Sequence, residues 1–126
     1  MGRTLEFYTL LGIGEAFRLH HDGSLMLVYL HVWGDRFIEV FAGGPPPDPT
    51  RTQSFMHLCL LTDDLQAAVE HLRRSGAAIN REPAVGLDGN LQAWTRDLDG
   101  NEIELVQLSE GSPQRRAARS SGRNGA

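Results

Sequence analysis

The sequence predicts an α+β fold built from two copies of one structural unit. Each half contains a segment with apolar residues at helical spacing, then a glycine, then three strand-like segments. The glycine- and proline-rich residues 43–49 separate the halves, and neither a helix nor a central strand runs through such a stretch. The two halves therefore show the same order of elements, with one difference at the start.

The first half has the order α-β-β-β. Residues 3–11 have helical spacing, and Gly12 is a suitable stop. Turn pairs of Asp and Gly then divide three strands at residues 16–20, 25–33 and 36–41. Because a helix begins at residue 3, the opening strand of this copy is missing.

The second half has the order β-α-β-β-β. A strand at residues 54–61 precedes a helix with Asp63 as its N-cap and Gly76 as its stop. A strand at 77–80, a loop at 83–90 and strands at 91–96 and 102–108 follow. We expect one domain over residues 1–108, with module 1 at about 1–44, a linker at 45–53 and module 2 at 54–108. Residues 109–126, rich in Arg, Ser and Gly, are expected to be a disordered tail.

Composition excludes several classes of function. The chain has 126 residues, 40% of them hydrophobic, and no apolar run near the roughly 20 residues that span a membrane. The single Cys59 excludes an intrachain disulfide and suits a cytoplasmic location. Before residue 109 there are 8 Arg and 15 Asp or Glu, a formal charge of −7, which argues against nucleic acid as a partner.

Three strands each place one metal-binding side chain among apolar neighbours, namely Glu39, His57 and Glu104. Singly, each has an ordinary explanation, because a strand His is usually hydrogen-bonded and a strand Glu usually faces water. Their positions in the repeat favour a site: both glutamates lie on the last strand of their half. An imidazole and two carboxylates suit zinc, nickel or cobalt. Glu102 shares a face with Glu104 but begins its strand, so we expect it to be solvated.

Four segments of the chain resemble the vicinal oxygen chelate superfamily, and glyoxalase I most closely. They are Phe-Tyr-x-x-Leu-Gly at 7–12, Arg-Phe-Ile-Glu-Val-Phe at 36–41, His57 with the helix after it, and Asp-Leu-Asp-Gly-Asn-Glu-Ile-Glu-Leu at 97–105. The resemblance implies two βαβββ modules that form a cupped mixed sheet around one divalent metal ion. Zinc or nickel is expected first, then cobalt, manganese or iron.

The resemblance also implies a ligand set. Glu39, His57 and Glu104 match the second, third and fourth ligands of the family. The first ligand belongs to the missing strand. His20, His21 and His31 are less favoured substitutes, since they occupy other strands and the first two flank a turn.

The implied reaction is that of lactoylglutathione lyase, which converts the methylglyoxal–glutathione hemithioacetal to S-lactoylglutathione with Glu104 as the base. Arg18 is then expected to meet a glutathione carboxylate. Apolar side chains are expected to line the substrate site: Phe37, Phe41, Phe55 and Trp94, the last of which also fits a plain core position.

Other functions within the superfamily remain open. One is a different metalloenzyme, such as a ring-cleaving dioxygenase or an antibiotic thiol transferase. Another is a non-catalytic small-molecule binder in the manner of bleomycin-resistance proteins, and a further one is an inactive scaffold. The family also implies a homodimer, since a missing first strand leaves a sheet edge open beside Glu39.

Overall fold

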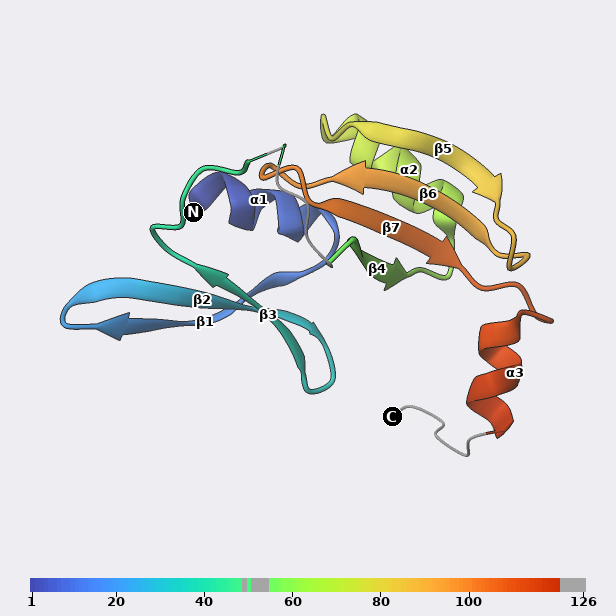
Figure 1. Cartoon of the computed structure of the whole chain (residues 1–126), viewed down its shortest axis with the longest axis horizontal. Coiled ribbons are helices and arrows are strands. Elements are labelled where there is room, and N and C mark those ends of the chain that lie inside the picture. Colours follow the sequence, from blue (N-terminus) through green and yellow to red (C-terminus); the bar gives the residue numbers. More distant parts are fainter. Residues whose placement is uncertain (49, 51–54, 121–126) are drawn as a thin grey trace. The chain divides into compact units, whose positions relative to one another are not determined.

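The computed structural model of the protein describes residues 1–48, 50 and 55–120. Three helices and seven strands make up an α+β fold in the described part of the chain, which confirms the expected class (Figure 1). Their order is α1 (Gly2–Leu10), β1 (Gly14–His21), β2 (Ser24–Trp33), β3 (Arg36–Phe41), β4 (His57–Leu61), α2 (Leu65–Arg74), β5 (Ile79–Val85), β6 (Leu91–Arg96), β7 (Glu102–Gln107) and α3 (Pro113–Ser120). No helix in this described part of the chain is long and apolar enough to cross a membrane.

The chain forms two compact units, Met1–Arg51 with Asp97–Gly100, and Thr52–Arg96 with Asn101–Ala126. In the first unit, β1, β2 and β3 make an antiparallel sheet in that order. Its buried core includes Phe7 and Tyr8 from α1 and Val28 and Leu30 from β2. These residues alternate along β2 with half-buried Tyr29, so one face of the sheet is closed and the other is more open.

A buried hydrogen bond holds α1 to the turn at Asp97–Gly100 within this unit. The Tyr8 hydroxyl donates to Oδ2 of Asp97 at 2.8 Å, and Oδ1 of Asp97 accepts from the backbone N–H of Asp99 at 2.9 Å. Burial, followed by the negative charge of Asp97, raises the pKa of Tyr8. Gly100 has φ +81°, a conformation that favours glycine and closes the turn. The sequence predicted the turn but not its buried partner.

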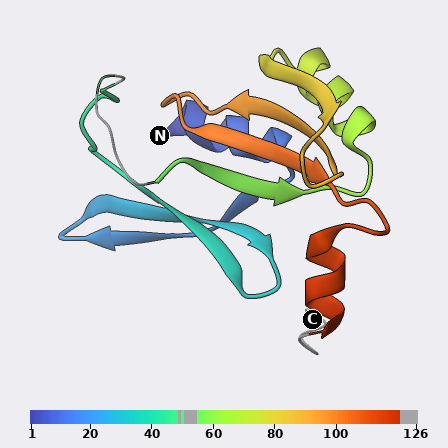
Figure 2. The ribbon, with the colours of Figure 1, turned by 45° about the vertical axis from the view of Figure 1, so that its right-hand side comes forward.

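The second unit has a four-stranded sheet in the order β4-β7-β6-β5. β4 runs parallel to β7, and the remaining pairs are antiparallel. Helix α2 lies along one face of this sheet (Figure 2). It buries Leu65, Val69 and Leu72, and the strands bury Ile103 and Leu105. The opposite face carries His57, Cys59, Trp94 and Glu104, whose places are set by the period of two along each strand.

Helix α2 begins one residue later than the sequence predicts. The N-cap is Asp64 rather than Asp63: its backbone is extended, with φ −141°, and its side chain accepts from the N–H of Ala67 at 3.0 Å. Oε1 of Gln107 accepts from the N–H of Leu65 at 2.8 Å and satisfies a second free donor of the first turn. Gly76, at φ +83°, follows the helix as expected.

Strand β5 differs most from the prediction within the domain. It runs to Val85, through Pro83, where the sequence predicted a strand of residues 77–80 and then a loop from 83. β5 is an outer strand of its sheet, and there a proline without an N–H leaves no ladder bond unmade. The strand predicted over 54–61 begins at His57, and residue 54 lies outside the described residues.

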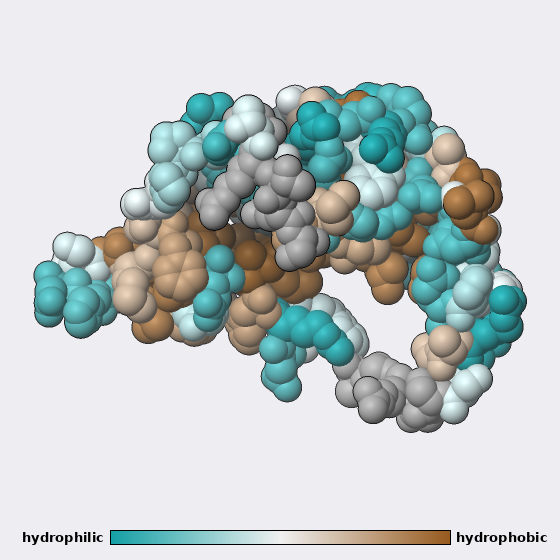
Figure 3. All heavy atoms as spheres, in the orientation of Figure 1, coloured by the Kyte–Doolittle hydropathy of each residue, from teal (hydrophilic) through white to brown (hydrophobic). Residues whose placement is uncertain are grey.

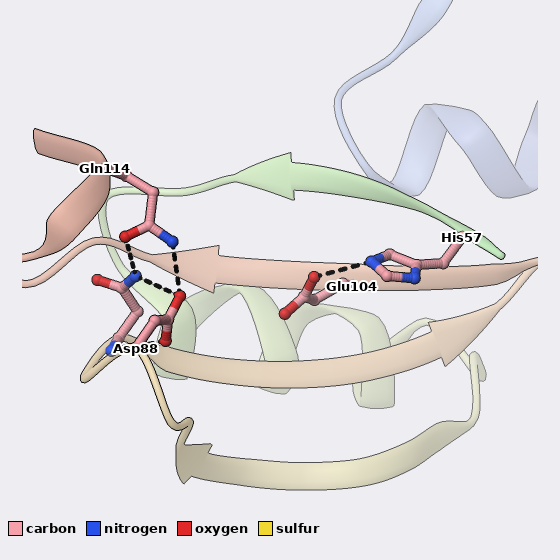
Figure 4. A network of polar contacts seen from close by, with 5 residues as sticks. His57, Asp88, Glu104 and Gln114 are labelled. Atoms are coloured by element: carbon pink, nitrogen blue, oxygen red, sulfur yellow. Dashed lines mark hydrogen bonds and ion pairs between the residues drawn. The ribbon is translucent and has the colours of Figure 1, made fainter. Parts of the chain in front are cut away.

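The prediction of a disordered tail is wrong for residues 113–120, which form α3. Ser112 is buried, and its hydroxyl accepts from the N–H of Arg115 at 3.2 Å as an N-cap. Pro113 follows at the first helical position, where its missing N–H costs nothing. Gln114 then donates to Oδ2 of Asp88 at 2.6 Å and ties α3 to the loop after β5 (Figure 4). Residues 121–126 lie outside the described residues.

Candidate functional site

His57 and Glu104 form the centre of the candidate site. Nε2 of His57 lies 3.1 Å from Oε2 of Glu104, and both side chains come from neighbouring parallel strands, β4 and β7 (Figure 4). The His57 side chain is 35% exposed and that of Glu104 is 17% exposed. Two of the three predicted metal ligands are thus brought together, with one nitrogen and one carboxylate oxygen at the same point of the sheet.

Trp94 packs against this pair from β6. It is directly opposite Glu104 in the ladder, and its ring meets the imidazole of His57 edge-on at 4.8 Å between centroids. On its other side the guanidinium of Arg81, from β5, lies 4.9 Å from the centre of the Trp94 ring. Trp94, predicted as a substrate wall or a core residue, is half-buried and contacts a predicted ligand.

Cys59 is a neighbour of Glu104 that the sequence reasoning missed. It stands opposite Glu104 in the parallel ladder. Burial, together with the charge and the hydrogen bond of Glu104, raises the pKa of the Cys59 thiol to about 11. The thiol is therefore protonated near neutral pH and donates to the carboxylate. The available signal was its spacing, because two residues after His57 a strand returns to the same face.

Glu39 lies on β3 in the first unit, directly opposite Tyr29 of β2. A hydrogen bond to Glu39 is the largest cause of the raised pKa of Tyr29. The pairing repeats that of the second unit, where Trp94 stands opposite Glu104. In each unit an aromatic residue of the penultimate strand faces the glutamate of the last strand, which supports the internal repeat predicted from the sequence.

Aromatic rings gather on the Glu39 face of the first sheet. Phe17 stacks on Tyr29 at 4.4 Å, and the ring of Phe37 lies 6.4 Å and 6.1 Å from these two. Phe17 and Phe37 remain 46% and 44% exposed, and Figure 3 shows apolar surface over these strands. Phe17 and Tyr29 were not predicted as site residues. Only the strand register reveals them, because it places Tyr29 across from Glu39.

The other predicted apolar side chains are exposed. Phe41 belongs to β3 and lies two residues after Glu39, so it shares that face and is 59% exposed. Phe55 precedes β4 and is 55% exposed. Exposed phenylalanines of this kind are available for contact with a ligand or another chain.

Arg18 forms an ion pair with Glu15. Its Nε and Nη2 donate to the two carboxylate oxygens of Glu15 at 2.5 and 2.8 Å. Arg18 stands opposite buried Val28, whereas its neighbour Phe17 stands opposite Tyr29. Arg18 therefore lies on the face of the sheet that does not carry Glu39.

The three histidines considered as substitute ligands are exposed or have other contacts. Nε2 of His31 lies 2.8 Å from the carbonyl oxygen of Gly34, and its ring is 5.3 Å from that of Phe37. His20 is exposed, and His21 forms an exposed ion pair with Asp22 at 3.4 Å.

Glu102 is not solvated as the sequence predicted. Its side chain is 25% exposed, and Oε1 accepts from Nε of Arg96 at 2.7 Å. The two residues stand opposite each other across β6 and β7, which brings the guanidinium to the carboxylate. Proximity to the start of a strand was therefore a poor guide to exposure.

The donor atoms can be compared with the needs of a divalent metal ion. One imidazole and carboxylates suit zinc or nickel, and the second unit supplies one of each at 3.1 Å. Glu39, the third predicted ligand, belongs to the first unit. Within residues 1–48, 50 and 55–120, no group of three or more His, Cys, Asp or Glu is arranged to hold a metal. The three predicted ligands therefore have donor atoms that suit a divalent metal ion. Two of them, His57 and Glu104, also lie close together.

Comparisons with known proteins agree with this architecture. The family model described as "Glyoxalase/Bleomycin resistance protein/Dioxygenase superfamily" matches residues 1–105. A bleomycin-binding protein solved in complex with bleomycin is 28% identical, with a TM-score of 0.64 over 86% of this chain and 90% of that one. A search of curated protein sequences gave no match.

Two solved structures under the name glyoxalase share the fold. A glyoxalase family protein from Enterococcus faecalis is 20% identical, with a TM-score of 0.68 over 84% of this chain and 87% of that one. A glyoxalase I mutant from Zea mays is 23% identical, with a TM-score of 0.73 over 86% of this chain and 41% of that one. At these identities the likeness concerns the fold alone.

Proposed function

Because the chain belongs to the glyoxalase, bleomycin resistance protein and dioxygenase superfamily, we propose that it is a metal-dependent isomerase of the glyoxalase I type. Its substrate is the hemithioacetal of methylglyoxal and glutathione, and its product is S-lactoylglutathione. The observation that supports this proposal most directly is the 3.1 Å contact between Nε2 of His57 and Oε2 of Glu104.

Glu104 acts as the base in this proposal. Its carboxylate takes the proton from the carbon beside the substrate carbonyl and returns it to the neighbouring carbon, so the reaction is an isomerisation with no net gain or loss of atoms. Glu104 is only 17% exposed, which limits competition from water. The Cys59 thiol donates to the same carboxylate and helps to fix its orientation.

In this proposal His57, Glu104 and Glu39 are the residues that would hold a divalent ion. When bound, the ion supplies a Lewis acid that stabilises negative charge on the substrate oxygens. The imidazole of His57 also contacts the ring of Trp94 edge-on. The aromatic side chains Phe17, Phe37 and Tyr29 form an apolar surface on the Glu39 face of the first unit.

One experiment tests the proposed reaction. The purified protein is loaded with nickel or zinc, and formation of S-lactoylglutathione from the hemithioacetal is followed by ultraviolet absorbance. Turnover that disappears with a chelator and returns with the metal supports the proposal. A metal-loaded protein without turnover contradicts it, as does a protein that binds neither metal.

A second candidate function is non-catalytic binding of a small apolar molecule. The stacked and exposed rings of Phe17, Tyr29 and Phe37 favour it, as does the 28% identity to a bleomycin-binding protein. Calorimetry with bleomycin in the presence of a chelator separates the two functions. Metal-independent binding supports the second candidate, and its absence together with turnover supports the first.

We also propose a homodimer. Among the described strands, only β2 pairs with β3, so the other edge of β3 is available to a second chain. Gel filtration with light scattering tests this directly. A mass of 13.9 kDa that does not change with concentration contradicts the dimer.

A further inference from the structure

Arg81 occupies a distinctive position beside the candidate site. It stands opposite Trp94 in the pairing of β5 and β6, and its guanidinium lies 4.9 Å from the centre of the Trp94 ring. The same ring contacts the imidazole of His57 at 4.8 Å. One indole therefore touches both a positive charge and a proposed metal ligand, all within the second unit.

The guanidinium of Arg81 has no acidic partner in the part of the chain that the structure describes, and it makes no hydrogen bond there. Three other arginines of the same unit are paired with acidic residues. Arg73 is paired with Glu82, Arg96 with Glu102 and Arg119 with Glu110. Arg18, expected from the sequence to meet a substrate carboxylate, donates from Nε and Nη2 to the two carboxylate oxygens of Glu15.

Stacking on an indole suits a guanidinium that binds an anion. When a guanidinium stacks in this way, its flat face lies on the ring and its N–H groups point outward in the plane. Those N–H groups match the two oxygens of a carboxylate, which accepts a pair of parallel hydrogen bonds. The Trp94 contact also reduces the number of rotamers that Arg81 must give up on binding.

We infer that Arg81 is a specificity-determining residue that binds a carboxylate of the substrate beside the His57–Glu104 pair. The inference rests on the proposed function for the identity of the substrate, a carboxylate-bearing thioester or hemithioacetal. It replaces Arg18 with Arg81 as the residue that recognises this anion. Trp94 is the ring over which the guanidinium of Arg81 lies.

The test compares two ligands that differ only in their carboxylates: S-lactoylglutathione and its diethyl ester. Affinities are measured by calorimetry without turnover, and the indole N–H signal of Trp94 is followed by NMR. The wild type is expected to bind the free acid about tenfold more tightly than the ester, the scale of one charge-assisted hydrogen bond. Arg81→Met is expected to bind both ligands about equally, and Arg81→Lys to fall between.

Affinity for the ester separates anion recognition from a packing role. If Arg81 only covers Trp94, Arg81→Met weakens both ligands alike and the preference for the acid persists, which overturns the inference. Arg73→Met is the matched control: it removes an arginine that is paired with Glu82, and it should keep the wild-type preference. Thermal unfolding of each variant confirms that the fold is intact.

The outcomes distinguish this inference from the proposed reaction. A preference for the acid that depends on Arg81, in a protein that does not turn over the hemithioacetal, supports the carboxylate site and contradicts the isomerase. Turnover of the hemithioacetal together with an unchanged preference of Arg81→Met for the free acid supports the isomerase and contradicts the carboxylate site. A Trp94 signal that does not respond to the free acid overturns the inference.

Discussion

Nε2 of His57 lies 3.1 Å from Oε2 of Glu104 although 47 positions separate the two residues in the chain. The contact follows from the parallel pairing of β4 with β7, the two strands that hold the side chains on one face. Sites that are built on paired strands hold their geometry better than sites on loops. The pair is therefore already in place before any ligand arrives.

Replacement of Glu104 by Gln should abolish most of the proposed isomerase activity. The amide keeps the shape of the side chain but does not accept a proton, and general-base catalysis contributes about 10²–10⁴-fold. The measurement is kcat of the nickel- or zinc-loaded variant. Glu70→Gln is the matched control, because Glu70 is exposed on α2 and should leave kcat unchanged. Equal activity of both variants would exclude Glu104 as the base.

Loss of His57 or Glu39 should weaken the binding of the divalent ion. His57→Ala and Glu39→Gln each remove one proposed ligand, and we expect more than about tenfold lower affinity, since even changes around a ligand cost that much. Competition with a chromophoric chelator measures the affinity. His20→Ala is the control, because His20 is exposed and lies on a different strand. Unchanged affinity in Glu39→Gln would remove Glu39 from the ligand set.

Replacement of Tyr8 by Phe should destabilise the fold. The hydroxyl donates to Oδ2 of buried Asp97 at 2.8 Å, and Tyr8→Phe removes this hydrogen bond from the buried carboxylate. The expected cost is about 1–3 kcal/mol, measured by urea unfolding near pH 7. Tyr29→Phe is the control, since Tyr29 is only half-buried and the loss of its hydroxyl should change stability less than the loss of the Tyr8 hydroxyl.

The contribution of Tyr8 should also depend on pH. Folding raises the pKa of Tyr8 above its ordinary value of 10.0, so the folded state keeps the proton where the unfolded chain loses it. The stabilisation is complete below pH 10 and declines as the pH rises above that value. The difference in unfolding free energy between the wild type and Tyr8→Phe should therefore shrink in alkaline solution, whereas a constant difference would contradict the assignment.

Replacement of Asn90 by Ala should weaken the attachment of α3 to the loop after β5. Asn90 is 1% exposed; its amide donates to Asp88 at 2.8 Å and to Gln114 at 2.9 Å, and its carbonyl accepts from the N–H of Ser109 at 2.8 Å. We expect a loss of about 1–3 kcal/mol and faster amide exchange over residues 113–120. Gln114→Ala should release the helix with a smaller effect on global stability. Exchange rates in α3 that match the wild type in both variants would contradict this role.

Strands with strong alternation could be predicted well from the sequence. β3 and β6 have the predicted bounds, because a period of two with aromatic and branched residues is a strong local signal. β5 was predicted too short, since the cost of Pro83 depends on whether the strand is an outer one. α3 was missed because its order comes from the contacts of Ser112 and Gln114, and its Arg-rich sequence has no buried face.

The site could be predicted in part. The alternation placed His57 and Glu104 among apolar neighbours, and the structure brings these two together. Cys59 was missed because a thiol resembles a small apolar residue until the register places it opposite Glu104. Arg81 was missed for a related reason: its contact with Trp94 depends on an irregular pairing of β5 with β6. Contacts across strands depend on register, which one strand alone does not specify.

The hydrogen bond from Tyr8 to Asp97 has a consequence for how the protein folds during synthesis. The two residues are 89 positions apart, so α1 gains this native partner only after most of the chain has left the ribosome. Contacts of such long sequence separation slow folding, because the loop between them must close first. Until Asp97 has been synthesised, the Tyr8 hydroxyl therefore lacks the acceptor that it has in the finished unit.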